Sequence, residues 1–506
     1  MPGPAAIEQQ PAIYSILWAC MSSWYFGYHL AELNFPVASL TCLTPVHAPR
    51  SRLPICLEID AFRYSTVTAL YTAGGLVGSL ASAWVVYKEG IKGGIVWTGY
   101  LNLVGVFLMG WSWNWGMLGL GRFVAGLSAG LAFCLIPPFL SLVARSSPQL
   151  SARSGQIGVI HQLAIVIGVF MAQVAGWLIT GSKGDTPGNW RFVVAISGVA
   201  SLGQIWAATK VFIPPEATIK AAVAGSATPA PAREDTSLLL QHTTETETSA
   251  SEPLLAGTAP TPFSPITSAQ TSTVTPQLPL RELLSNTSLR GTTMLCATVI
   301  SFQALSGVNA VMFYSTPVLK TLLPNSAGMI GIGIATVNAL MTLPAVFLVD
   351  VIGKKNLLLF SVISMSITSA ALAHGLNSHS PNLSAFAIIG FIASFAVGLG
   401  PIPFLLIPDL VPAQAIPALS SLAFALNWTL NIMIALLFLP LRNLLSSPTD
   451  PSDPMATART NEGNVFYVFM ATSAILALVV WRGLPNAPGS GMGPGGAVAG
   501  LGIGRV

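Results

Sequence analysis

The sequence predicts an all-α membrane protein with about twelve transmembrane helices in two sets of six. Of its 506 residues, 52% are hydrophobic and 8% are charged, whereas soluble domains have about 25% charged residues. The mean hydropathy is +0.68. Apolar runs of about 20 residues, the length that crosses a bilayer, begin near residues 13, 63, 93, 115, 156, 190, 291, 327, 356, 384, 416 and 463. A polar stretch after the sixth run separates the two sets.

Composition predicts four segments along the chain. Residues 1–213 form the first six-helix half, and the first apolar run is too long and too aromatic for a cleaved signal, so we expect it to be retained. Residues 214–288 are rich in Ala, Thr, Ser, Pro and Glu and predict a disordered loop, because they cannot bury enough apolar surface to offset their ordering entropy. Residues 289–483 form the second half, and residues 484–506, rich in Gly and Pro, form a flexible tail.

The loop charges predict an orientation. Lys and Arg are more numerous on the side that holds both termini and the central loop, with Lys354 and Lys355 as the clearest pair. Such an excess marks the cytoplasmic side. The formal charge of +4 therefore reflects topology, and no nucleic-acid partner is expected.

The loops on the opposite side carry two candidate modification sites. Cys42 and Cys56 share the first loop, and because that compartment can be oxidising, a disulfide and two free thiols both stay open. Their spacing is not that of metal ligands, so no metal is expected. Asn382 begins an Asn-Leu-Ser sequon in a short loop and is a candidate glycosylation site.

Polar amides stand out in the seventh apolar run. Gln303, Ser306 and Asn309 fall on one side of a helix with 3.6 residues per turn. In hydrocarbon an unpaired amide costs several kcal/mol, so such groups either bond to another helix or line a watery cavity. Amides donate and accept hydrogen bonds as sugar hydroxyls do, so the pattern favours a small neutral sugar as ligand.

Six motifs give the chain a resemblance to a known family. They occur in this order: FGY at 26–28, GRF at 121–123, HQL at 161–163, GVNAVMFYST at 307–316, GPIPF at 400–404 and NW at 427–428. The chain resembles the sugar porter family of the major facilitator superfamily, which includes glucose transporters and sugar-proton symporters. The resemblance implies a major facilitator fold, with substrate bound near the bilayer midplane between two six-helix halves.

The resemblance also implies a substrate site. Its polar contacts are expected to be Gln162, Gln303, Asn309, Asn338 and Asn431. Its apolar wall is expected to comprise Phe26, Phe404 and Trp428, with Tyr314 as a gate residue. Phe404 stands where the family usually has tryptophan, and Ala304 replaces the second glutamine of the usual pair, which predicts a changed sugar preference. The alternative for each amide is an interhelical bond worth about 1 kcal/mol.

One departure from the family bears on proton coupling. The symporters carry an aspartate directly after FGY, opposite the arginine of GRF, and here that position is His29. The absence of this aspartate favours uniport. Glu32 lies on nearly the same helix face as His29, so two alternatives stay open: Glu32 accepts the proton, or it forms a fixed ion pair with Arg122.

The resemblance marks a mobile helix and its charged contacts. Pro401 and Pro403 cannot continue regular helix bonding, and Gly400 permits close packing, so we expect the tenth span to break there and act as a gate. Asp350 and Asp409 retain two acids of the family's cytoplasmic gate, although several of its other charges are missing. Ion pairs of this gate normally keep the outward-open state closed on the cytoplasmic side. With fewer of them, we expect a shifted balance between transporter conformations or slow turnover.

The central loop contains a candidate sorting signal. Glu234 precedes Leu238 and Leu239 in a pattern that resembles the acidic dileucine signal read by adaptor coat proteins, with chance as the alternative. The chain also resembles fungal homologues, some of them vacuolar. Together these features predict an internal, vacuolar membrane rather than the cell surface.

The sequence thus predicts a facilitative uniporter that moves a hexose-like monosaccharide across a lipid bilayer by alternating access. No enzyme chemistry and no cofactor are expected, because the chain lacks a nucleotide-binding glycine loop, a metal cluster and a nucleophile spaced with a base. Two rival hypotheses remain. One is a proton-coupled carrier that uses Glu32, and the other is a non-transporting sugar receptor or sorting partner that acts through its central loop.

Overall fold

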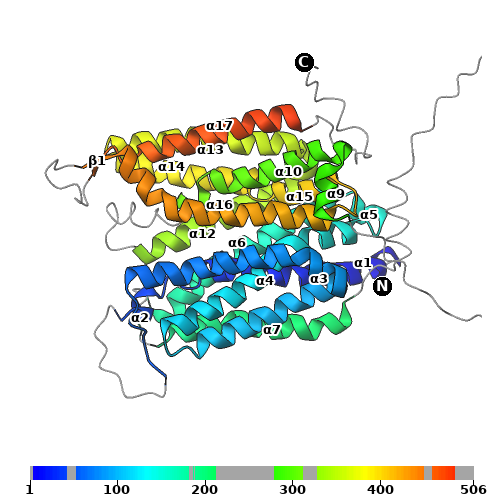
Figure 1. Ribbon diagram of the computed structural model, residues 1–506, viewed down its shortest axis with the longest axis horizontal. Helices are drawn as coiled ribbons and strands as arrows, with labels where there is room; N and C mark the ends of the chain where they lie inside the picture. The colour runs from blue at the N-terminus through cyan, green and yellow to red at the C-terminus, as the bar shows by residue number, and fades with distance from the viewer. Residues whose placement is uncertain are drawn as a thin grey trace, which may run out of the picture.

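Two bundles of long helices lie side by side in the computed structural model (Figure 1). The structure describes residues 4–42, 53–181, 186, 188–211, 278–311, 327–448 and 459–484. The start of the first helix and the end of the last lie at the same end of the bundle, which we call the terminal side.

The first bundle is built from the N-terminal part of the chain. Its elements are α1 (Pro4–Ala31), α2 (Val37–Leu40), α3 (Ala61–Gly110), α4 (Trp115–Ala144), α5 (Pro148–Ser151), α6 (Ser154–Thr180), α7 (Trp190–Ala207) and the 3₁₀ turn η1 (Ala208–Lys210). The 50 residues of α3 would extend about 75 Å as one straight helix. The chain turns back at Gly90, where φ is 70°, a value that glycine adopts without strain. The two arms of α3 are therefore the spans predicted from residues 63 and 93.

The second bundle follows the central loop. Its elements are α9 (Leu280–Ser285), α10 (Thr287–Leu305), α12 (Ala327–Ile352), α13 (Lys354–Asn377), α14 (Pro381–Ser394), the π-helical turn η2 (Phe395–Leu399), α15 (Ile402–Leu410), α16 (Ile416–Leu445) and α17 (Asn464–Gly483). The short strands β1 (Ser447–Pro448) and β2 (Arg459–Thr460) pair in antiparallel fashion between α16 and α17.

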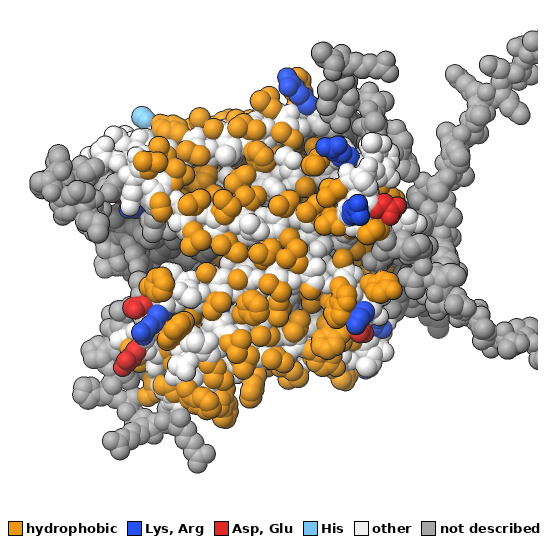
Figure 2. Space-filling view, viewed as in Figure 1, with side chains coloured by type: hydrophobic (Ala, Val, Ile, Leu, Met, Phe, Trp, Pro, Cys, Tyr) orange, Lys and Arg blue, Asp and Glu red, His pale blue; other side chains and the backbone are white. Residues whose placement is uncertain are grey.

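The described helices account for the predicted spans. Ten of them are long and apolar enough to cross a membrane. The two arms of α3 count separately, and α1, a helix of 28 residues that is not among these ten, brings the number of long helices to the predicted twelve. Figure 2 shows hydrophobic side chains over the flank of both bundles and charged side chains near the two ends. This distribution matches a bilayer around the flank.

One predicted boundary is wrong. Residues 278–288 belong to the segment expected to be disordered, yet they contain α9 and the first two residues of α10. Leu283 is fully buried, and the Leu278 N–H donates to Gln414 O at 3.2 Å. Leu283 and the partly buried Leu278 therefore stabilise this stretch by packing against the core of the second bundle. Residues 212–277 and 485–506 lie outside the described part of the chain.

Candidate functional site

A row of amide side chains connects α10, α16 and the turn before α15. Gln303 Nε2 donates to Leu399 O at 2.8 Å and to Gly400 O at 3.2 Å. Asn427 Nδ2 donates to Ile300 O at 2.8 Å and lies 3.5 Å from Gln303 Oε1. Gln303 therefore links the seventh span directly to the break in the tenth.

The row continues along α16 to Asn309. Asn431 Nδ2 donates to Asn427 Oδ1 at 2.9 Å, and Asn309 Nδ2 donates to Asn431 Oδ1. The expectation that Gln303 and Asn309 share one face of an unbroken helix is wrong, because α10 ends at Leu305 and Gly307 adopts φ 83°. Gln303 and Asn309 still belong to the same row, because the side chain of each contacts an asparagine of α16.

Two further predicted contacts come from other helices. Gln162 on α6 is buried, and its Nε2 lies 3.3 Å from the place where a Cβ on Gly400 would stand. Asn338 on α12 is buried, and its Oδ1 has no hydrogen-bond partner among the described residues. Glycine at position 400 thus leaves room for the amide of Gln162 against the broken helix.

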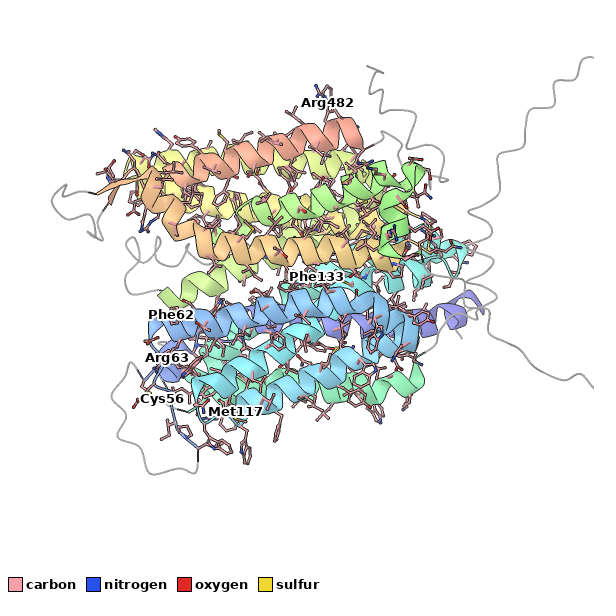
Figure 3. All side chains as sticks on the ribbon, viewed as in Figure 1. Cys56, Phe62, Arg63, Met117, Phe133 and Arg482 are labelled. Carbon is pink, nitrogen blue, oxygen red and sulfur yellow. A yellow bond between two sulfur atoms is a disulfide. The ribbon has the colours of Figure 1, made fainter. Side chains whose placement is uncertain are left out.

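Aromatic rings fill the seam between the bundles. We call Phe26, Phe133, Phe404, Phe424 and Trp428 the aromatic cluster. The Phe133 ring centroid lies 4.6 Å from that of Phe26, 5.0 Å from Phe404, 5.2 Å from Phe424 and 5.7 Å from Trp428. Phe26 and Phe133 belong to the first bundle and the others to the second, and Figure 3 places Phe133 where the bundles meet. The expected wall residues thus lie together at the seam.

Polar and charged contacts join the bundles on the terminal side. Arg145 Nη2 donates to Pro408 O at 3.0 Å. The Asp350 carboxylate accepts from the Gln156 N–H at 3.2 Å, in the first turn of α6, where the helix dipole favours a negative charge. Asp409 instead pairs with Lys354 inside the second bundle. The structure therefore holds the bundles together on this side through Arg145 and Asp350.

The tenth span breaks where its prolines predict. Helix α14 passes into a π-helical turn at Phe395, and Gly400 N–H donates to Phe395 O at 2.8 Å before α15 begins at Ile402. A small cavity lies beside this break at the seam. It is lined by Pro137, Ser141, Ser154, Gly158, Phe404, Leu405, Pro408 and Asp409.

His29, Glu32 and Arg122 form a buried charge cluster inside the first bundle. His29 and Glu32 are fully buried and Arg122 is 3% exposed. Arg122 Nη1 donates to Glu32 Oε1 at 3.1 Å and to His29 O at 2.7 Å. Its guanidinium also lies 4.6 Å from the ring centroid of Tyr71. An ion pair with Glu32 thus holds Arg122 in place.

Hydrogen bonds around His29 determine where one of its protons lies. Ser201 Oγ donates to Ser197 O, so it must accept from Asn102 Nδ2, which lies 2.7 Å away. Asn102 Oδ1 therefore faces His29 Nε2 at 2.6 Å and accepts a hydrogen bond from it, so Nε2 carries a proton.

A second proton belongs to the contact between His29 and Glu32. His29 Nδ1 lies 2.7 Å from Glu32 Oε1. Without a proton, two lone pairs would face each other at this distance, so either an imidazolium or a carboxylic acid supplies one.

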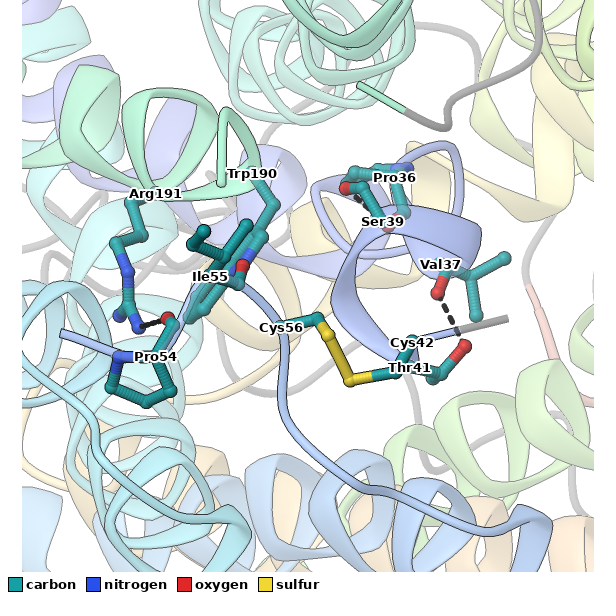
Figure 4. Close-up of a disulfide and its surroundings, with 10 residues drawn as sticks. All are labelled: Pro36, Val37, Ser39, Thr41, Cys42, Pro54, Ile55, Cys56, Trp190 and Arg191. Carbon is teal, nitrogen blue, oxygen red and sulfur yellow. Dashed lines mark hydrogen bonds between the residues drawn. A yellow bond between two sulfur atoms is a disulfide. The ribbon is translucent and has the colours of Figure 1, made fainter. Parts of the chain in front are cut away.

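The predicted cysteine pair is bonded. Cys42 and Cys56 form a disulfide that joins the end of α2 to the segment before α3 (Figure 4). Trp190 Nε1 donates to Ile55 O at 3.0 Å, and Arg191 Nη2 donates to Pro54 O at 2.6 Å. The disulfide and the start of α7 together position this loop.

The remaining predicted residues lie elsewhere. Asn382 is exposed in the first turn of α14, whereas Ser384 of the same sequon is 3% exposed. Tyr314, Glu234, Leu238 and Leu239 lie outside the described residues.

The structure adds three polar residues to the predicted set. Asn427 completes the amide row, Asn102 orients His29, and His161 lies against the aromatic cluster, with its ring centroid 4.8 Å from that of Phe404. Asn427 and His161 fall within the NW and HQL motifs, and Asn102 is a lone amide in an apolar run. Each signal was present in the sequence, but none indicated which neighbour the side chain would meet.

Comparison with known proteins identifies the family. The sequence matches the model of the sugar (and other) transporter family over residues 15–227 and 234–492. The chain belongs to this family. It is 25% identical to the facilitated glucose transporter protein 1 of Caenorhabditis elegans, over 94% of this chain and 88% of that protein. It is 24% identical to the vacuolar protein sorting-associated protein 73 of Saccharomyces cerevisiae, over 94% of each.

The fold matches a solved transporter. The xylose-proton symporter XylE of Escherichia coli, bound to 6-bromo-6-deoxy-D-glucose, superposes with a TM-score of 0.68 at 16% identity, over 95% of this chain and 97% of XylE. The predicted family and the major facilitator fold are confirmed. This family member is a multi-pass membrane protein of sugar transport.

Proposed function

We propose that this transporter is a facilitative uniporter for a neutral, hexose-like monosaccharide and that it works by alternating access. The observation that carries the proposal is the row of uncharged amides formed by Gln303, Asn427, Asn431 and Asn309. Their donors and acceptors match the hydroxyl groups of a sugar, and a hydroxyl can exchange with an amide partner at little net cost. Gln162 and Asn338 supply amides from α6 and α12.

The contacts between the bundles support alternating access. On the terminal side, Arg145 binds a backbone carbonyl, and Asp350 binds a backbone N–H at a helix start. Among the described residues, these two bonds and the one that Ser421 Oγ donates to Ser79 O at 2.8 Å would have to break for the bundles to separate. Gln303 ties the amide row to the carbonyls at the helix break, so a sugar that competes for Gln303 would also free the gate. We take the terminal side as cytoplasmic because of its excess of Lys and Arg.

Proton coupling is the second candidate function, and the His29–Glu32 contact favours it. That contact holds one exchangeable proton in a fully buried cluster. If the proton leaves in one conformation and returns in the other, sugar flux and proton flux become linked. The uniporter is preferred because Arg122 Nη1 lies 3.1 Å from Glu32 Oε1, a contact that suits a fixed ion pair.

Uptake by the purified protein distinguishes these functions. Proteoliposomes are expected to take up radiolabelled D-glucose saturably and at the same rate with and without an imposed proton gradient. Empty liposomes and L-glucose serve as controls. Acceleration by the gradient that disappears in Glu32→Gln would establish proton coupling instead. No uptake of any hexose or pentose would favour the receptor hypothesis.

We propose further that the transporter resides in a vacuolar or other internal membrane. Similarity to the yeast vacuolar protein sorting-associated protein 73 supports this location, as does the dileucine pattern of Glu234, Leu238 and Leu239, which would bind adaptor coat proteins. Changing both leucines to alanine is expected to move a fluorescent fusion from internal membranes to the cell surface. A second leucine pair in the same loop, Leu254 and Leu255, follows Glu252 and Pro253 and resembles the signal less well, so alanine at these two positions is the matched control. Unchanged internal fluorescence in the first variant would contradict the sorting role.

A further inference from the structure

His161 presents a buried polar atom for which the described residues offer no partner. The side chain is fully buried on α6, and its Nδ1 lies 2.7 Å from Ser23 Oγ on α1. Its Nε2 makes no hydrogen bond within the described part of the protein. An unpaired buried polar atom costs about 1–3 kcal/mol, so its position calls for a partner that arrives from outside.

The ring of His161 lies at the seam between the bundles. Three residues of α6 on adjoining turns face the second bundle: Gly158 contacts the Leu405 side chain, His161 meets the Phe404 ring edge-on, and Gln162 lies against Gly400. Gly158 and Phe404 also line the cavity beside the helix break. His161 therefore belongs to the same surface as the proposed sugar site.

Two other unpaired atoms come from the second bundle. Trp428 Nε1 and Asn338 Oδ1 are buried and have no partner among the described residues. The Phe133 ring lies between Trp428 and His161. Its centroid is 5.7 Å from that of Trp428 and 5.9 Å from that of His161. Unpaired donors and acceptors on α6, α12 and α16 are the groups that a polyol inserted at the seam would satisfy.

One group of buried polar side chains in the first bundle forms a closed network. Tyr25, in the first bundle, donates to Gln204 Oε1 at 2.8 Å, and Gln204 Nε2 donates to Ser22 Oγ at 2.6 Å. Tyr25 also lies 2.7 Å from Thr98 Oγ1. This network joins α1, α3 and α7 without an unpaired side-chain atom. Other buried atoms, such as Thr293 Oγ1 and Ser473 Oγ, also lack a partner among the described residues. His161 is therefore distinguished by its place at the seam together with its unpaired atom.

We propose that His161 Nε2 forms a hydrogen bond with a hydroxyl group of the transported sugar and thereby helps to determine which sugars are accepted. The inference rests on the proposed transport function. The hydrogen bond between Ser23 and Nδ1 determines whether Nε2 donates to the sugar or accepts from it. If Ser23 donates to Nδ1, Nε2 carries the proton and donates to the sugar, and in the other tautomer it accepts. A sugar hydroxyl suits either case.

Two isosteric variants test this role. In His161→Asn the amide nitrogen takes the place of Nδ1 and keeps the bond to Ser23, but no atom replaces Nε2. In His161→Gln the amide nitrogen takes the place of Nε2. For equilibrium binding of D-glucose to the purified full-length protein, the asparagine variant is expected to raise Kd about tenfold, the size of one hydrogen bond of about 1.4 kcal/mol. The glutamine variant is expected to stay within about threefold of wild type.

Ser23→Ala and monodeoxyglucoses complete the test. For wild type, one monodeoxyglucose is expected to bind about tenfold more weakly than D-glucose. For His161→Asn, the same monodeoxyglucose and D-glucose are expected to bind with equal affinity, and the missing hydroxyl is then the one that His161 pairs with. If His161 only joins α1 to α6, then His161→Gln and Ser23→Ala will weaken binding while His161→Asn will not, and the proposal is overturned. Wild-type protein that binds no sugar would overturn the transport function itself. Thermal unfolding in detergent confirms that each variant is folded.

Discussion

Gln303→Leu is expected to lower the kcat/KM of sugar uptake by about 100-fold or more. Leucine has a similar volume but removes the donor to Leu399 O and Gly400 O and the oxygen that faces Asn427. A transported sugar loses its central amide contact, and two buried carbonyls at the helix break lose their donor. Two such losses, at about 1–3 kcal/mol each, account for the size of the effect, since 1.4 kcal/mol is a factor of about ten.

Initial rates of D-glucose uptake into proteoliposomes measure this change. Gln156→Leu is the matched control, because Gln156 contacts Asp350 through its backbone N–H, which the substitution keeps. Its uptake is expected to stay near wild type. If Gln303→Leu kept normal kinetics, the amide row would be interhelical bonding without a part in sugar binding.

Arg122→Leu is expected to destabilise the transporter by about 3–5 kcal/mol, the usual cost of removing one partner of a buried ion pair. Glu32 Oε1 would lose its donor, and this fully buried carboxyl group would keep only its contact with His29. The substitution also removes the donor to His29 O and the cation beside the Tyr71 ring. The yield of monodisperse protein and its unfolding temperature in detergent should both fall sharply.

A second substitution distinguishes charge from packing. Glu32→Gln puts a neutral amide in place of the buried carboxyl group that has lost its Arg122 partner, so the double variant is expected to recover much of the stability that Arg122→Leu loses. Arg63→Leu is the matched surface control. Its partner Asp60 lies 3.8 Å away, the Arg63 side chain is 46% exposed, and such pairs contribute at most about 1 kcal/mol. A double variant no more stable than Arg122→Leu would show that the buried charge is not the cause.

The sequence by itself determined the architecture. Long apolar runs in a bilayer must form helices, because every backbone polar group needs an internal partner, so the twelve spans and the two halves could be counted from hydropathy alone. Proline chemistry likewise predicted the break after Gly400, since Pro401 and Pro403 cannot continue helix bonding. Family motifs then indicated which polar residues to inspect.

The tertiary structure alone decided the partners of those residues. The row from Gln303 to Asn309 depends on α16, which begins more than a hundred residues later in the chain, and on the turn at Gly307 that ends α10. Whether Glu32 meets Arg122, and whether His161 keeps an unpaired nitrogen at the seam, depends equally on how separate helices pack. Hydrogen bonds act over about 3 Å, and no periodicity within one helix predicts which distant side chain comes within that distance.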